Sequence, residues 1–414
     1  MDINNQQNYG SLRISVISSV AYIPIAGATV TIAYTEEPSR PIFSGTTDSS
    51  GETGIIQLTA PAFDYSQAPS EVQPYTDYNI TVEAQGYEPI LVSGTEILPD
   101  RLALQQIRMQ PVDITQEEER IVVIPVHTLF GEYPPKIPED EIKPMAETGE
   151  IVLSRVVIPE YVIVHDGVPT DSTAPNYWVR YKDYIKNVAS CEIYATWPEA
   201  SLYANILAIM SFTLNRVYTE WYRNQGYDFT ITSSTAYDQK WIYGRNIYEN
   251  IDVLVDTVFA NYLSRPGVRQ PILAAYCDGE RVTCNGLSQW GSRYLGEEGY
   301  TAIEILRYFY GNDIYINTAV AISGVPSSYP GYDLTIGSSG DKVRQLQNQL
   351  NRIARNYPAI PTITADGIYG PATAEAIRVF QGVFNLPQTG VTDYATWYEV
   401  SDIYVGVSRI AEPS

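Results

Sequence analysis

The chain has 414 residues, of which 44% are hydrophobic and 18% are charged, which excludes a disordered or fibrous protein. Asp and Glu outnumber Lys and Arg by 48 to 26, and the formal net charge is −22. Because nucleic-acid binders use Lys and Arg to release phosphate counterions, this charge argues against DNA, RNA and polybasic membrane contacts. At roughly 100–200 residues per domain, the length predicts two to four domains.

The counts of individual residue types further limit the kinds of active site and ligand that the chain can have. With only two His, His127 and His165, a His-rich metal site or a Ser-His-Asp triad is disfavoured. The 34 Tyr against 9 Phe suit carbohydrate surfaces, and they equally suit core and interface positions. The N-terminal run MDINNQQNYG lacks the basic and apolar regions of a signal peptide, and no apolar run reaches about 18 residues. We therefore expect synthesis in the cytoplasm and no membrane insertion.

Residues 1–112 are predicted to form an all-β sandwich. Short segments of alternating apolar residues, such as Leu12, Ile14 and Val16, are separated by turns rich in Gly, Pro and Asp. The runs PIAGATVTI, TTDSSGETG and YNITVEAQGYEP resemble the carboxypeptidase regulatory-like, or transthyretin-like, domains. The resemblance implies a passive module for adhesion or assembly, so this domain is a candidate contact surface for a protein partner.

Residues 113–150 have the composition of an acidic, Pro-rich linker. The runs DITQEEER and GEYPPKIPEDEIKP are typical of a stiff, extended and solvated chain. The run RIVVIPVHTL between them is suited to one strand, in which case part of the linker packs. We expect His127 in this run to be structural rather than a metal ligand.

After a short linker at 326–335, residues 336–414 are predicted to form a small helical module. Apolar residues recur at helical spacing in 341–353 and 371–384, and the run DGIYG between them is a turn. The series GSSG, LQ, DGIYG, FQ and TW resembles the peptidoglycan-binding domain type 1, a three-helix module. The resemblance implies a groove that binds the cell wall, although most of these positions are core and turn residues that define the fold.

Residues 151–325 form the central domain, for which we expect an α+β fold. Its most informative run is CEIYATWPEASLYANILAIM. The segment Thr196-Trp197-Pro198-Glu199 has the pattern of a capping box, with Thr as the cap and Glu three residues later. The helix that follows is predicted to be amphipathic and half buried. Glu192 stands on a short turn before it.

The central domain resembles the stage II sporulation protein D family over roughly residues 155–318. The matching runs are CEIYATWPE, the serine-rich TITSSTAYD, ILAAYCDGE, the signature GLSQWG and the closing EILRYFYGND. The enzymes of that family are lytic transglycosylases of peptidoglycan. The resemblance therefore implies peptidoglycan glycan strands as both substrate and partner.

Roles carry over from the family residue by residue. Glu192 matches the acid/base, and one carboxyl group suffices because the sugar's own hydroxyl attacks and closes an anhydro ring. Ordinary glycosidases need two carboxylates, because water or the enzyme attacks. The alternative is that Glu192 is only a capping or surface carboxylate. The candidate substrate-binding residues are Ser288, Gln289, Tyr237, Tyr276 and Trp197.

The sequence departs from the family at its metal position. Many relatives have a His before the signature, where this chain has Thr283-Cys284-Asn285-Gly286. Some relatives bind zinc nearby, so Cys277 and Cys284 are weak candidate ligands; two thiols alone make an incomplete site, since structural zinc takes four ligands. A disulfide or two free thiols is favoured over zinc, and no cofactor is expected. Cys191 is expected to be a buried structural thiol.

Two functions of different classes follow. The first is an enzyme, a peptidoglycan lytic transglycosylase of spore or cell-wall remodelling that its C-terminal module holds on the wall. The second is a non-catalytic peptidoglycan-binding structural protein of a spore layer, surface or phage-like assembly, which the missing His favours. In a bacterium, association with the spore from the mother-cell side, or release by lysis, would bring either protein to the wall without a signal peptide.

Overall fold

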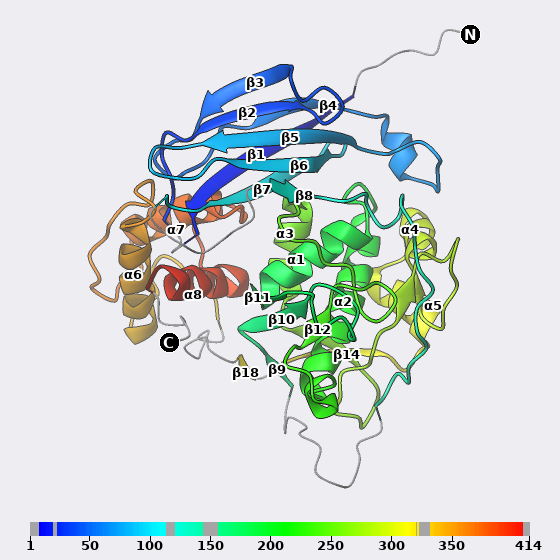
Figure 1. Ribbon diagram of the computed structural model, residues 1–414. Coiled ribbons are helices and arrows are strands. Elements are labelled where there is room, and N and C mark those ends of the chain that lie inside the picture. The colour runs from blue at the N-terminus through cyan, green and yellow to red at the C-terminus, as the bar shows by residue number, and fades with distance from the viewer. Residues whose placement is uncertain are drawn as a thin grey trace.

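The computed structural model describes residues 8–19, 23–112, 121–143, 156–319, 321–322 and 332–408. These residues form a β-rich N-terminal part, a mixed central part and a helical C-terminal part. The N-terminal sheets lie across the other two parts (Figure 1). The β-rich N-terminal part and the helical C-terminal part agree with the predicted fold classes of these segments.

The N-terminal part consists of two facing sheets. One has the strand order β3-β2-β5-β6-β8, and the other has the order β13-β7-β1-β4. Their strands are β1 (Asn8–Ser18), β2 (Thr29–Tyr34), β3 (Pro41–Thr46), β4 (Ile56–Ala60), β5 (Thr76–Glu83), β6 (Ile90–Ile97), β7 (Leu102–Met109), β8 (Ile121–Val123) and β13 (Ile247–Tyr248). The first eight follow the predicted sandwich and linker segments, but β13 comes from the central part.

The apolar residues that alternate along the first strand are all buried: Leu12, Ile14 and Val16. Successive side chains of a strand point to opposite faces, so one apolar face is enough to orient it. In the predicted turn, the Asp48 carboxylate accepts hydrogen bonds from Ser50 N and Glu52 N. Only Gly fits at position 51, because φ of Gly51 is +73° and a Cβ would lie 2.5 Å from the Val16 carbonyl oxygen.

The central part surrounds one long helix, α2. Its elements are β9 (Val157–Ile158), β10 (Tyr161–His165), β11 (Asn176–Arg180), α1 (Tyr181–Glu192), α2 (Glu199–Tyr218), β12 (Ile231–Thr232), α3 (Glu249–Val258), β14 (Asn261–Ser264), β15 (Tyr276–Cys277), β16 (Leu287–Ser288), α4 (Gln289–Glu297), α5 (Ala302–Tyr310), β17 (Tyr315–Thr318) and β18 (Ala321–Ile322). Among the described helices, none is both long enough and apolar enough to cross a membrane.

Helix α2 differs from its prediction in two ways. It begins after Pro198, and no side chain caps it, because the Thr196 hydroxyl instead donates to Ser66 Oγ of the N-terminal part at 2.7 Å. The predicted capping box is therefore wrong: a distant partner takes the hydroxyl. The helix is also buried around its whole circumference rather than half buried, because α1, α3, α4, α5 and β14 surround it.

The N-terminal and central parts share one sheet and one core. Strand β13 pairs antiparallel with β7, and the buried apolar residues of both parts form a single cluster. At this junction the Arg245 guanidinium makes two hydrogen bonds of 2.6 Å to the Glu96 carboxylate, with both side chains buried. Arg245 also donates to the Ser190 carbonyl near the end of α1. The sandwich is thus fixed to the helix that ends at Glu192.

The described part of the predicted linker, residues 121–143, is partly packed: residues 127–129, Tyr133 and Lys143 are buried, while Glu132, Pro134, Pro135 and Pro138 are exposed. After β8, which extends β6, the chain runs along the central part without regular helix or strand (Figure 1). We call residues 126–143 the strap. Leu129 and Tyr133 of the strap are each only 7% exposed. The solvated-linker prediction fails only for the buried residues of this segment, because partners far away in the chain cover them; residues 113–120 and 144–150 lie outside the described residues.

The C-terminal part has its own core of three helices. These are α6 (Asp341–Ala354), α7 (Pro371–Val383) and α8 (Tyr394–Ser408), and they confirm the predicted helical module. One buried ion pair, between Lys182 of α1 and Glu399, attaches α8 to the central part. Within the central part, Lys182 also contacts Asp256 of α3, and Lys186 contacts Asp252 and Asp256. Because an unpaired buried charge is costly, these contacts fix how the helices dock.

Substitution of Arg245 tests the junction between the N-terminal and central parts. Arg245→Met leaves the Glu96 carboxylate buried without a cation, so we expect the free energy of unfolding to fall by about 3–5 kcal/mol in urea titrations followed by circular dichroism.

Glu96→Met combined with Arg245→Met removes both charges, and it should recover part of this loss. The matched control is Arg40→Met, which removes an exposed pair with Glu37. Its effect should stay within about 0.5 kcal/mol. A loss for Arg245→Met no larger than that of the control would contradict a shared, cooperative junction.

Candidate functional site

Glu192 is the last residue of α1, and its side chain is completely buried. Its Oε1 accepts a hydrogen bond from Lys240 N at 2.8 Å, and its Oε2 accepts one from Gln289 Nε2 at 3.3 Å. Gln289 Nε2 also donates to the main-chain carbonyl of Glu192, at 2.9 Å. The structure therefore brings together the candidate acid/base and a candidate substrate-binding residue that lies 97 positions away in the chain.

The signature GLSQWG positions Gln289. Gly286 passes so close to the Ala275 carbonyl that a Cβ would lie 1.9 Å from its oxygen, so only Gly fits. Ser288 is the N-cap of α4, and its hydroxyl accepts a hydrogen bond from Gly291 N at 2.9 Å. Gln289, the first residue of the helix, can then reach the carboxylate at the end of α1.

Glu192 differs from the other buried carboxylates in having no ion pair within the described part of the chain. The others pair as follows: Glu96 with Arg245, Asp238 with Arg216, Asp252 and Asp256 with Lys186, Asp278 with Arg281, and Glu399 with Lys182. Taking a carboxylate out of water without a cation is costly, even where hydrogen bonds remain.

The remaining candidate residues have other partners. Trp197 is 2% exposed: its Nε1 donates to the Ser66 carbonyl, and its ring packs 4.9 Å from that of Trp290, so it offers no face to a sugar in this structure. Tyr276 is also 2% exposed, and burial raises the pKa of its hydroxyl. Tyr237 is partly exposed.

The three cysteines are accounted for structurally. Cys277 and Cys284 form a disulfide, with Cα atoms 6.1 Å apart, so neither sulfur is available as a zinc ligand. Within the described part of the chain, no three His, Cys, Asp or Glu side chains converge as metal ligands. Cys191 is buried, as predicted, and burial raises the pKa of its thiol to about 12, which disfavours a nucleophilic thiolate.

Two strap residues that the sequence placed in a linker lie at the site. Lys136 Nζ donates to the Asp238 carbonyl at 2.6 Å and lies 4.8 Å from the Tyr276 ring centroid. Burial lowers the pKa of Lys136 while the Glu192 charge raises it, and burial together with the Glu192 charge raises the pKa of Tyr133. No local pattern could have revealed them, since Lys136 and its hydrogen-bond partner are 102 residues apart.

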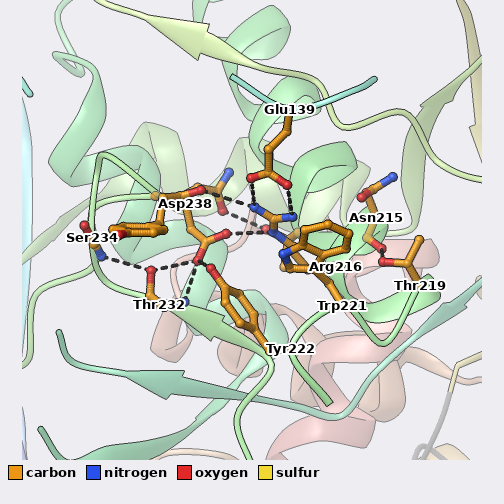
Figure 2. Close-up of polar contacts among 12 residues, drawn as sticks. Glu139, Asn215, Arg216, Thr219, Trp221, Tyr222, Thr232, Ser234 and Asp238 are labelled. Atoms are coloured by element: carbon orange, nitrogen blue, oxygen red, sulfur yellow. Dashed lines mark hydrogen bonds and ion pairs between the residues drawn. The ribbon is translucent and has the colours of Figure 1, made fainter. Parts of the chain in front are cut away.

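A buried ion network lies beside these residues, and Figure 2 shows two carboxylates directed at the Arg216 guanidinium. Asp238 Oδ1 accepts from Arg216 Nε at 2.7 Å, and Glu139 of the strap accepts from both terminal nitrogens at 2.6 and 2.9 Å. The second Asp238 oxygen accepts from the Tyr222 hydroxyl and from Thr232 N and Oγ1. Every charge is compensated, so this network is structural and holds one end of the strap.

The C-terminal module contains two equivalent glutamines. Gln347 of α6 accepts from Gly367 N at 2.8 Å, and Gln381 of α7 accepts from Gly390 N at 2.9 Å. Each side-chain amide also donates to three oxygens around the turn that it holds. Both glycines have positive φ. These residues of the predicted pattern therefore stabilise turns, as expected for positions that define the fold.

Comparison with known families identifies this module. Residues 339–399 match the model of a putative peptidoglycan binding domain, which confirms the prediction for the C-terminal part and supports binding to the cell wall. The match covers this part of the chain and not the central or N-terminal parts. No curated protein matches the chain.

The solved structures that match this chain are similar to it only over limited parts. The chain is similar to the TIE protein of Bacillus anthracis, with 17% identity over 25% of this chain and 18% of that chain and a TM-score of 0.19. It is also similar to GBS52, the minor pilin of Streptococcus agalactiae, with 18% identity over 28% of this chain and 49% of that chain and a TM-score of 0.19. A third similar structure is transthyretin from Sparus aurata, with 12% identity over 24% of this chain and 89% of that chain and a TM-score of 0.15. This chain spans less than two thirds of the first two. At these TM-scores the likenesses carry no argument about fold or function.

Proposed function

We propose that this protein attaches to peptidoglycan through residues 339–399 and that its central domain, a member of the stage II sporulation protein D family, is a lytic transglycosylase with Glu192 as acid and base. The observation that carries the catalytic proposal is the Glu192 carboxylate itself. It is buried, it is hydrogen-bonded to Gln289, and it has no ion pair among the residues that the structure describes. The resemblance of CEIYATWPE and GLSQWG to that family supports the same roles.

One carboxyl group suffices for this reaction. Its proton passes to the glycosidic oxygen as the bond from that oxygen to the anomeric carbon breaks. A hydroxyl of the same sugar then attacks the anomeric carbon, gives its proton to the carboxylate and closes an anhydro ring. No water is consumed, and the carboxyl group returns to its starting state. Gln289 would hold the carboxylate in the required orientation through its side-chain amide.

One observation favours the alternative, a non-catalytic wall-binding structural protein. Glu192, Gln289 and Tyr276 are all 2% exposed or less, so a substrate reaches the carboxylate only if the residues over it move. The missing His before the signature fits the same alternative, as does a junction that joins the N-terminal sheets and the central part in one core. A spore-associated or released location is part of either proposal.

The enzyme proposal is tested by digestion of purified glycan strands. Wild-type protein is expected to produce anhydro-sugar ends, which mass spectrometry detects. Glu192→Gln keeps the size of the side chain but removes the titratable group that gives and takes the proton, so the rate of end formation should fall by about 10²–10⁴-fold.

The matched control is Glu199→Gln, which changes an exposed carboxylate seven positions away and should keep the wild-type rate. Cosedimentation of the same preparations with insoluble peptidoglycan separates the two functions. Wild-type protein that binds the wall but forms no anhydro ends contradicts the enzyme and leaves the structural alternative. Protein that does not bind contradicts wall attachment.

Net charge predicts an unusual salt dependence of wall binding. Intact peptidoglycan often carries carboxylates, and a chain of charge −22 is repelled by them over the Debye length, about 30 Å at 0.01 M salt and about 8 Å at 0.15 M. We expect the bound fraction in cosedimentation to rise between these concentrations. Glycan freed of its stem peptides should show a smaller rise, and binding that weakens with added salt would contradict the repulsion.

A further inference from the structure

We propose that the strap, residues 126–143, is a displaceable cover over the Glu192–Gln289 pair, and that a peptidoglycan glycan strand takes its place on the central part. This inference rests on the proposed function, because it states how a glycan strand reaches Glu192. It adds a binding surface, the one that the strap now occupies, and a step that precedes catalysis.

The strap covers the elements that hold the Glu192 carboxylate. His127 stacks on Tyr194, two residues after Glu192, with ring centroids 4.4 Å apart. Lys136 Nζ bonds the Asp238 carbonyl, and two residues further along the chain Lys240 N donates to Glu192 Oε1. The strap therefore contacts the chain on both sides of the carboxylate.

Charged side chains of the central part hold both ends of the strap. At one end, Arg281 donates to the carbonyls of Thr128 and Gly131. At the other end, Glu139 accepts two hydrogen bonds from Arg216, and Glu141 accepts two from Arg265 at 2.7 Å each. These are charge-assisted contacts, several of them bidentate, which are the strong class of hydrogen bond.

The middle of the strap, residues 132–138, is held more weakly. In the described structure, two hydrogen bonds join it to the central part: Lys136 Nζ to the Asp238 carbonyl, and Ile137 N to the Ala236 carbonyl at 2.9 Å. Three of its seven residues are Pro, which have no N–H to donate. The Lys136 hydrogen bond is itself charge-assisted, and the Arg281 guanidinium lies 5.8 Å from the Tyr133 ring centroid. Because the middle has fewer charge-assisted contacts than the ends, the middle can lift while the strap stays attached.

A displaceable strap explains how the chain tolerates the Glu192 carboxylate, which is buried without an ion pair among the described residues. A carboxylate that is buried without an ion pair is tolerated if its burial belongs to one of two states and a ligand selects the other. Lifting of residues 132–138 removes Tyr133 and Lys136 from the site and admits an extended polymer along the path that they leave. The wall-binding module in the same chain holds the protein beside such polymers.

Hydrogen–deuterium exchange of the full chain tests the proposal, with soluble glycan strands freed of stem peptides as the probe. On saturation with glycan, we expect the Ile137 amide to exchange about tenfold faster, because its bond to the Ala236 carbonyl is broken. Protection within residues 339–399 is read in the same experiment and reports wall binding by the C-terminal module.

Variants test the cover without glycan. Lys136→Ala removes a charge-assisted hydrogen bond, so the Ile137 amide should exchange about tenfold faster and carbodiimide should label Glu192, which is protected in the wild type. Lys136→Arg keeps the charge and should restore protection. The control is Glu132→Ala, which changes an exposed strap residue and should resemble the wild type.

Each outcome decides one proposal. If saturating glycan leaves exchange at Ile137 unchanged, or if Lys136→Ala leaves both exchange and labelling unchanged, the cover proposal is overturned. Missing protection within residues 339–399 counts against wall attachment instead. If Lys136→Ala fails to fold, the glycan experiment on wild-type protein still decides.

Discussion

The guanidinium of Arg245 is the contact on which the arrangement of the N-terminal and central parts depends. It binds the Glu96 carboxylate of β6 and the Ser190 carbonyl of α1, and it lies two residues before β13, which extends the N-terminal sheet. A buried ion pair is tolerated only when its geometry is good and its remaining hydrogen bonds are made, so this contact admits one orientation of the two parts. Glu192 follows Ser190 by two positions, and its place is therefore set by the sandwich as well as by its own helix.

The same rule, that a buried charge needs a partner of opposite charge, distinguishes structural charged residues from the candidate catalytic residue in the rest of the molecule. The Arg216 network and the ion pairs of Lys182 and Lys186 behave as structural ties, because each of their buried carboxylates contacts a cation. Glu192 is the exception among the described buried carboxylates, and it is also the residue that the family resemblance assigns to catalysis. Lys136 of the strap binds the Asp238 carbonyl, two residues before the amide that donates to Glu192, and under the cover proposal the strap causes the burial that argues against an active enzyme. Whether the protein cleaves glycan and whether the strap moves are therefore linked questions about one surface.

Local patterns predicted much of the fold. Period-two alternation predicted β1, helical spacing predicted α6 and α7, and the Gln and Gly landmarks predicted the C-terminal module, because each of these depends on residues close together in the chain. The capping box at Thr196 was wrong, and the solvated linker was wrong for the buried residues among 121–143, for a common reason. In both cases the side chain forms a hydrogen bond with a residue more than 70 positions away instead of the locally expected arrangement. Thr196 bonds to Ser66, and Glu139 bonds to Arg216. Such partners have no signature in the neighbouring sequence.

The sequence by itself determined the order of the three parts, the peptidoglycan-binding character of the last one and, through the family resemblance, the candidate pair Glu192 and Gln289. Only the tertiary structure decided that this pair is in contact, that Cys277 and Cys284 form a disulfide, and that Lys136 of the strap binds the chain beside the site. The reason is physical. A motif states which chemical groups are present, but the exposure and pairing of a charge depend on what the rest of the chain brings next to it.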